Sequence, residues 1–294
     1  MFQPQGFSET RGRSQRLFQH APAETARLAD ALLEFVINLF HGRVDGFLPC
    51  DTAFHDLNHT LEATRVALDL LEAHRHNPQF TPLRESDWLL VFAAVLFHDT
   101  GYLKRKGDSE GSGAKYSAIH VGRSCFLAWD FLPAFGFTSD ELRQVQNAIC
   151  ATAVSARMDQ LPFRNLREWL IAAIVVTGDM LGQMAAPDYP ERLPGLYLEF
   201  REAGAFSRFR KSSFGAYQSL QDLLAGTEKF FYRHVLPTLD TELRGVYRLL
   251  TDQSGSNVYL DHVRFNVARV SDMAKLLADN SPDPSLPRAG SDPS

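Results

Sequence analysis

The amino-acid sequence predicts an all-α protein that forms one large domain, a helical bundle. Apolar residues recur at the three- and four-residue spacing of helices through most of the chain, and few segments alternate as strands do. The 294 residues include 45% apolar residues, enough to bury a sizeable core. No internal repeat and no change of composition demands a second domain.

The first half of the chain is predicted to contain three helices. Residues 22–42 carry apolar positions at helical spacing and end at a glycine, a common C-cap, and residues 58–74 repeat the pattern. After a polar break that contains proline, Ser86 or Asp87 is expected to cap a third helix that is almost wholly apolar up to Phe97. A helix that is apolar all round is buried, so this one is expected at the centre of the domain.

The second half is predicted to begin with a loop and to continue as helices. Residues 104–115 are rich in glycine and charge, which indicates a loop. Further helices are predicted at 117–134, 139–155, 166–184, 194–204, 215–240 and 256–279. The helical domain is expected to span residues 22–280, between a flexible N-terminus (1–21) and a disordered, low-complexity tail (281–294).

Composition argues against several classes of protein. The formal net charge of −5 gives no electrostatic reason to expect nucleic acid or an anionic membrane as partner. The N-terminus lacks the apolar segment of a secretory signal, and the longest apolar runs fall short of the ~20 residues that span a bilayer. The three cysteines are an odd number without Cys-x-x-Cys spacing, which favours a reducing cytoplasm over a disulfide framework.

Two histidines four residues apart, His55 and His59, form the first candidate site. At the start of a helix this spacing puts both rings on one face, where they can bind one metal or place a metal ligand beside a proton donor. The spacing alone is weak evidence, because two histidines on a helix surface produce the same pattern.

Further titratable residues lie at the ends of apolar helices or inside them. His98 and Asp99 end the most apolar helix, and Asp179 lies in the middle of another. Charge buried there needs a metal or an ion-pair partner, because burial without one is costly. The alternatives are a helix end that emerges into water for His98 and Asp99, and a salt bridge or a helix-cap hydrogen bond for Asp179. His120 follows the glycine-rich loop, where a lone histidine is more often structural.

Taken together, these residues suit a metal centre. The pair His55 and His59, the pair His98 and Asp99, and the single residues His120 and Asp179 lie on or beside separate apolar helices. Imidazole nitrogen with carboxylate oxygen suits Mn, Fe, Co, Ni or Zn better than Ca. A metal in an open site produces hydroxide at neutral pH and neutralises phosphate charge. The pattern therefore indicates hydrolysis of a phosphate ester.

The same residues resemble the HD superfamily of metal-dependent phosphohydrolases, in the branch similar to class I cyclic nucleotide phosphodiesterases. The superfamily pattern His … His-Asp … Asp matches His59, His98, Asp99 and Asp179. The Tyr-His-Asn-x-x-His box of this branch is similar to Phe54-His55-Asp56-Leu57-Asn58-His59. The resemblance covers about residues 30 to 275 and implies an HD-domain helical bundle.

The resemblance also implies a role for each residue. The implied metal ligands are His59, His98, Asp99 and Asp179, with His120 at a second, weaker ion. His55 would be the general acid, and Asp99, which can bridge two ions, is counted with it as catalytic. The implied substrate contacts are His120, Lys104, Lys115 and Gln183.

Three of the departures from the pattern of the family bear on the chemistry of the site. Asp56 stands where the box usually has asparagine. Thr152 stands where some binuclear members have a further histidine, which weakens the case for a second metal held fully by the protein. Thr227 falls at the position of the glutamine that holds the purine in phosphodiesterases, so cAMP or cGMP as substrate is not secured.

The predicted function is that of a cytoplasmic metal-dependent phosphodiesterase. Its substrate would be a small phosphoester, a nucleotide or cyclic nucleotide, attacked by metal-activated hydroxide with His55 as general acid. One or two divalent transition metals (Mn, Fe, Zn, Ni or Co) are expected; Mg and a homodimer are left open, and no membrane or nucleic-acid partner is expected. Two alternatives are a di-iron HD oxygenase, which needs more histidine ligands, and a non-catalytic nucleotide-binding HD module, which a degenerate metal site would favour.

Overall fold

The computed structural model describes residues 6–77, 80–206 and 217–279, and within these ranges the chain is helical with no strand. This confirms the prediction of a single all-α domain. The helices are α1 (Phe7–Phe18), α2 (Ala23–Phe40), α3 (Leu57–His76), α4 (Glu85–Phe97), α5 (His120–Phe131), α6 (Ser139–Ala151), α7 (Leu166–Ala185), α8 (Tyr189–Phe206), α9 (Leu220–Phe230) and α10 (Val258–Asp279). Short turns join them, including the 3₁₀ turn η1 (Thr100–Tyr102) that follows α4.

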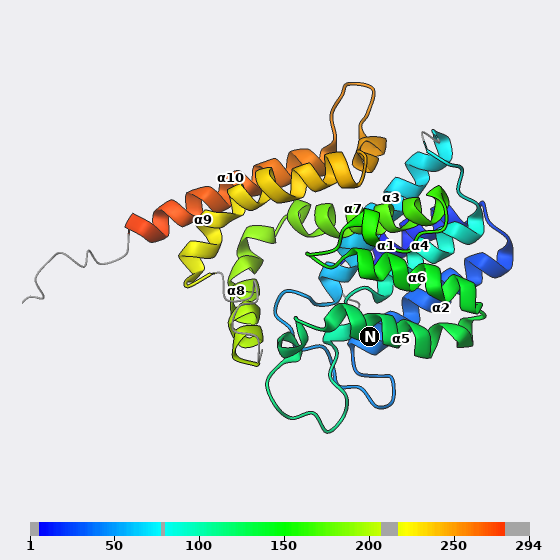
Figure 1. Ribbon diagram of the computed structural model, residues 1–294, viewed down its shortest axis with the longest axis horizontal. Coiled ribbons are helices and arrows are strands. Elements are labelled where there is room, and N and C mark those ends of the chain that lie inside the picture. Colours follow the sequence, from blue (N-terminus) through cyan, green and yellow to red (C-terminus); the bar gives the residue numbers. More distant parts are fainter. Residues whose placement is uncertain (1–5, 78–79, 207–216, 280–294) are drawn as a thin grey trace, which may run out of the picture.

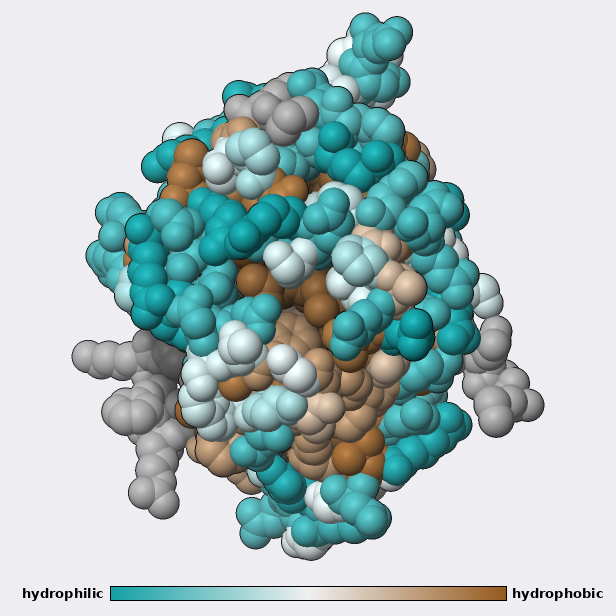
Figure 2. Space-filling view, turned by 90° about the vertical axis from the view of Figure 1, so that its right-hand side faces the viewer, coloured by the Kyte–Doolittle hydropathy of each residue, from teal (hydrophilic) through white to brown (hydrophobic). Residues whose placement is uncertain are grey.

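The apolar helix α4 lies at the centre of the bundle, as its composition predicts. It packs against α2, α3, α6 and α7, and its residues from Leu90 to Phe97 are buried. The helices α9 and α10 run side by side and, with α8, extend away from this bundle (Figure 1). Viewed from the opposite end, hydrophilic residues cover most of the surface around a central apolar area (Figure 2).

The structure differs from the sequence-based expectation at several helix boundaries. The N-cap of α4 is Arg84 rather than Ser86 or Asp87. Asp87 instead accepts a hydrogen bond from the Arg84 backbone N–H (2.8 Å) and pairs with Arg167 (2.7 Å), so it caps the helix from its third position. The helix expected at 215–240 begins later, at Leu220 of α9, and after Phe230 the chain continues in π-helical turns as far as Glu242; residues 215 and 216 lie outside the described parts.

The N-terminal segment also differs from expectation. Residues 1–21 were predicted to be flexible, but they include α1, whose Phe7, Leu17 and Phe18 are buried. Arg13 of α1 forms an ion pair with Asp69 of α3. The segment is polar on average, so only these tertiary contacts reveal its order. The predicted tail, 281–294, lies outside the described residues.

Two glycines let α7 approach α3 closely. A Cβ atom on Gly182 would lie 2.7 Å from the backbone N and Cα of Ala63, and one on Gly178 would lie 2.9 Å from the Ala63 carbonyl oxygen. Both distances are too short for any side chain, so this crossing requires glycine. It brings the α7 residue Asp179 up to α3, which carries His59.

The variant Gly182→Ala is expected to destabilise the fold by about 1–3 kcal/mol, the usual cost of overpacking a close contact. The measurement is urea unfolding of the metal-free protein. The matched control is Gly122→Ala, because a Cβ on this glycine of α5 meets nothing within 4 Å and alanine is the better helix former. Equal midpoints for Gly182→Ala and the wild type would show that the crossing tolerates a wider spacing.

No single helix in the described parts of the chain is long and apolar enough to cross a membrane. The pair α7 and α8, bent by 110° at the break between them, passes that test by length and composition together. All but a few residues of α7 are buried in the core.

Candidate metal centre

Three helices carry four titratable side chains to one point in the core. His59 lies in the first turn of α3, where Asp56 caps the helix by accepting a hydrogen bond from the His59 backbone N–H (3.0 Å). His98 and Asp99 directly follow α4. Asp179 comes from the middle of α7. His59, His98 and Asp99 are at most 3% exposed, so the cluster is part of the core.

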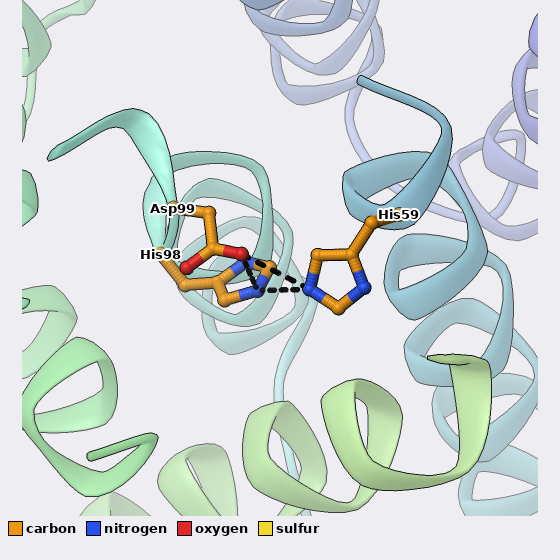
Figure 3. A group of neighbouring side chains, drawn as sticks. All are labelled: His59, His98 and Asp99. Atoms are coloured by element: carbon orange, nitrogen blue, oxygen red, sulfur yellow. Dashed lines mark hydrogen bonds and ion pairs between the residues drawn. The ribbon is translucent and has the colours of Figure 1, made fainter. Parts of the chain in front are cut away.

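The facing atoms of these side chains are in mutual contact. His59 Nε2 lies 3.2 Å from His98 Nε2 and 3.0 Å from Asp99 Oδ2, and His98 Nε2 lies 3.3 Å from Asp99 Oδ2 (Figure 3). Asp179 Oδ1 lies 3.3 Å from His59 Nε2 and 3.5 Å from His98 Nε2. The predicted ligands His59, His98, Asp99 and Asp179 therefore come together in the fold.

This arrangement fits a divalent metal ion. The contacts of 3.0–3.5 Å match the roughly 3.0–3.4 Å between neighbouring ligands around an ion bound at about 2.1 Å. Asp99 Oδ2 is buried and, although close to both ring nitrogens, has no donor with hydrogen-bond geometry. His98 donates from Nδ1 to the Val95 carbonyl oxygen (2.7 Å), which leaves the lone pair of Nε2 facing the cluster. The group His59, His98 and Asp99 can thus hold a metal.

The two histidines and two carboxylates of the cluster shift one another's pKa. Burial disfavours charge on His59, but the close contacts and negative charge of Asp179 and Asp99 outweigh it and raise the His59 pKa to about 9. The two carboxylates likewise raise the pKa of His98 well above its ordinary value, against the effect of burial. Contacts with the two histidines overcome burial and lower the pKa of both Asp99 and Asp179. Protons on the imidazole rings thus supply the positive charge beside Asp99 and Asp179 that a bound metal ion would otherwise supply.

Metal binding is therefore expected to release protons and to weaken as the pH falls. A ligand imidazole must be deprotonated, so below the His59 pKa of about 9 the metal competes with a proton, at about tenfold in affinity per pH unit for each proton displaced. Titration calorimetry with Mn²⁺ in two buffers of different ionisation enthalpy counts these protons. An affinity that is constant between pH 6 and pH 9 would contradict the assignment of His59 as a ligand.

His120 lies next to this cluster. Its Nε2 is 3.7 Å from Asp99 Oδ1, the oxygen that does not face His59 and His98, and its Nδ1 is 2.7 Å from the Ser117 carbonyl oxygen. Burial lowers the His120 pKa, which keeps the ring neutral and Nε2 free to bind. Gly101 makes this placement possible, since a Cβ there would lie 1.9 Å from the His120 carbonyl oxygen.

His55 lies beside the cluster and has its own carboxylate partner. Its Nδ1 is 2.5 Å from Glu199 Oε2, while Glu199 Oε1 accepts hydrogen bonds from the backbone N–H groups of Phe54 (2.6 Å) and His55 (3.2 Å). Tyr102 stacks on the His55 ring with centroids 4.7 Å apart and on the His120 ring at 4.5 Å. The sequence analysis missed both Glu199 and Tyr102. Glu199 sits in a predicted helix, where no local pattern separates a buried glutamate from a surface one.

The two lysines that are predicted to contact the substrate have other partners in the structure. Lys104 pairs with Asp51 (2.7 Å) and donates to the Gly111 carbonyl oxygen (2.6 Å), and Lys115 pairs with Asp108. Both ammonium groups thus hold the 104–115 loop together and would have to exchange partners to bind phosphate. Gln183 lies one turn after Asp179 on α7 and is partly exposed. The roles of these three residues in substrate binding stay predictions.

The two threonines that depart from the family pattern each form a hydrogen bond to a nearby main-chain carbonyl group. Thr227 is buried in α9 and donates its hydroxyl hydrogen bond to the Leu223 carbonyl oxygen (3.0 Å). Thr152 follows α6 and donates to the Ile149 carbonyl oxygen (2.8 Å). Both hydroxyl protons are thus used in local bonds to main-chain carbonyl groups.

Comparison with known proteins yields one family. Residues 144–272 match the family model described as Npun_R2479-like, and no match to an HD-domain family accompanies it. No curated protein matches the chain. The matched segment runs from α6 to α10 and includes Asp179 and Glu199, but not His59, His98 or Asp99.

Proposed function

We propose that this protein is a metal-dependent phosphohydrolase of the HD type, and that it hydrolyses a phosphodiester bond in a nucleotide or cyclic nucleotide. The observation that carries the proposal is the meeting of four ligand atoms from α3, α7 and the end of α4, with His59, His98 and Asp99 in contacts of 3.0–3.3 Å. Nitrogen and oxygen donors of this kind favour Mn, Fe, Co, Ni or Zn. The motifs resembling the HD superfamily supply the choice of reaction.

Within this proposal each residue around the cluster has a separate role. A bound divalent ion supplies an activated water and neutralises the charge of the phosphoryl group. His55, whose side chain is 18% exposed, holds the proton for the leaving oxygen. Glu199 is 3% exposed and fixes the ring by its contact with Nδ1, which leaves Nε2 as the atom that donates. His120 supports a second ion or the substrate phosphate beside Asp99.

The proposal is tested by measuring metal and turnover on one sample. The protein is purified without chelator, its metals are determined by elemental analysis, and hydrolysis of bis-p-nitrophenyl phosphate is assayed with Mn²⁺ or Mg²⁺ added. We expect one or two transition-metal ions per chain, diesterase turnover, and loss of both after chelation, with recovery when Mn²⁺ is returned.

Other outcomes of this experiment would indicate a different function. Stoichiometric metal without turnover on this ester or on a panel of cyclic nucleotides would contradict the diesterase, and bound iron with oxygen consumption would indicate the oxygenase. Absence of metal, even after reconstitution, would overturn the metal centre and leave a helical binding module.

A further inference from the structure

Two of the three cysteines meet between α5 and α6. Cys125 Sγ lies 3.5 Å from Cys150 Sγ, which is van der Waals contact between two sulfur atoms. The third, Cys50, contacts the Thr52 hydroxyl (3.0 Å) and the His55 carbonyl oxygen instead. The cysteines are 25 residues apart in the chain, so only the fold brings them together.

The two helices are fixed against each other at this point. The Gln146 side chain of α6 donates to the Cys125 carbonyl oxygen (3.1 Å), and the Cys125 thiol is directed at the Gln146 carbonyl oxygen (3.6 Å). Cys125 is 9% exposed and Cys150 is more open to solvent. A disulfide bond of about 2.05 Å requires the two sulfur atoms to approach by about a further 1.5 Å.

We propose that Cys125 and Cys150 are a peroxide-oxidisable thiol pair that closes to an intramolecular disulfide. The Cys150 thiolate attacks the O–O bond of hydrogen peroxide; an S–O bond forms, hydroxide leaves and takes up a proton as water, and Cys150 becomes a sulfenic acid. The Cys125 sulfur then attacks the Cys150 sulfur, the S–S bond forms, and the Cys125 proton leaves with the hydroxyl as a second water.

The surroundings of the thiols support this order of events. The contact with Cys125 lowers the Cys150 pKa to about 7, against the effect of burial, and raises that of Cys125. Burial raises the Cys50 pKa to about 11, so this thiol stays protonated at neutral pH and serves as an internal control. The chemistry is independent of the proposed hydrolase function.

The test is mass spectrometry of the full-length protein after treatment with hydrogen peroxide and labelling of the remaining thiols under denaturing conditions. We expect a loss of 2 Da and a fall from three labelled thiols to one, reversed by dithiothreitol. Tryptic digestion should link peptides 124–143 and 144–157 and leave peptide 44–65, which carries Cys50, labelled. The pair should react at least about tenfold faster than Cys50.

Single variants complete the test. Cys50→Ser should still lose 2 Da, with both remaining thiols consumed, whereas Cys150→Ser and Cys125→Ser should not. Cys150→Ser changes the more exposed partner and is the safer variant for folding. Oxygen addition at Cys150 of the wild type without a cross-link, links that include Cys50, or no reaction at all would overturn the proposal.

Discussion

Asp99→Ala is expected to lose both the bound metal and the hydrolase activity. Asp99 Oδ2 is the oxygen that contacts both ring nitrogens, at 3.0 Å from His59 and 3.3 Å from His98. Removing it leaves two buried imidazoles 3.2 Å apart with only Asp179 to offset their charge. A metal contributes several kcal/mol to phosphoryl transfer and each 1.4 kcal/mol is tenfold in rate, so turnover should fall at least about 10³-fold.

The measurement pairs elemental analysis with turnover for the variant and its controls. Asp99→Asn keeps the shape of the side chain and tests the charge alone, which guards against a folding defect in the alanine variant. Asp130→Ala removes an exposed aspartate of α5 and should change neither quantity. Retention of stoichiometric metal by Asp99→Ala and Asp99→Asn would place the metal elsewhere.

The sequence allowed the cluster to be predicted because of where its residues lie. His98 and Asp99 end the most apolar helix, and Asp179 interrupts another, so burial and therefore a partner could be inferred for each. Which partner each has could not be inferred. The close approach of α7 to α3 requires Gly178 and Gly182, whose role depends on the backbone of α3 across the crossing.

The roles of residues that depend only on contacts distant in the sequence could not be predicted. Glu199 lies 144 residues after His55, and no local spacing connects the two. The same reason hid α1, whose average composition is polar but whose apolar face packs on the bundle. Periodicity gave the order of the helices correctly and their ends less well, because Arg84 rather than a serine or aspartate occupies the N-cap of α4.

His55→Gln is expected to keep the metal and lose most turnover on substrates with a poor leaving group. The His55 ring centroid lies 5.5 Å from that of His59, and His55 is not among the side chains that face the metal position. General acid help contributes typically ~10²–10⁴-fold, so this is the expected loss on a 3′,5′-cyclic nucleotide, whose leaving oxygen belongs to a sugar hydroxyl. Glu199→Gln should lose less, since the ring remains but its orientation is weakened.

The leaving group separates protonation from other roles of His55. A p-nitrophenolate needs little protonation to depart, so on bis-p-nitrophenyl phosphate the same variant should lose less than about tenfold. The exposed His76→Gln, whose ring is far more open to solvent, should match the wild type on both esters. Equal losses of His55→Gln on the two esters would mean that His55 orients the substrate rather than donating a proton. Loss of the metal from this variant would make His55 a ligand, and the Glu199 carboxylate beside it would then orient a metal-binding ring instead of an acid.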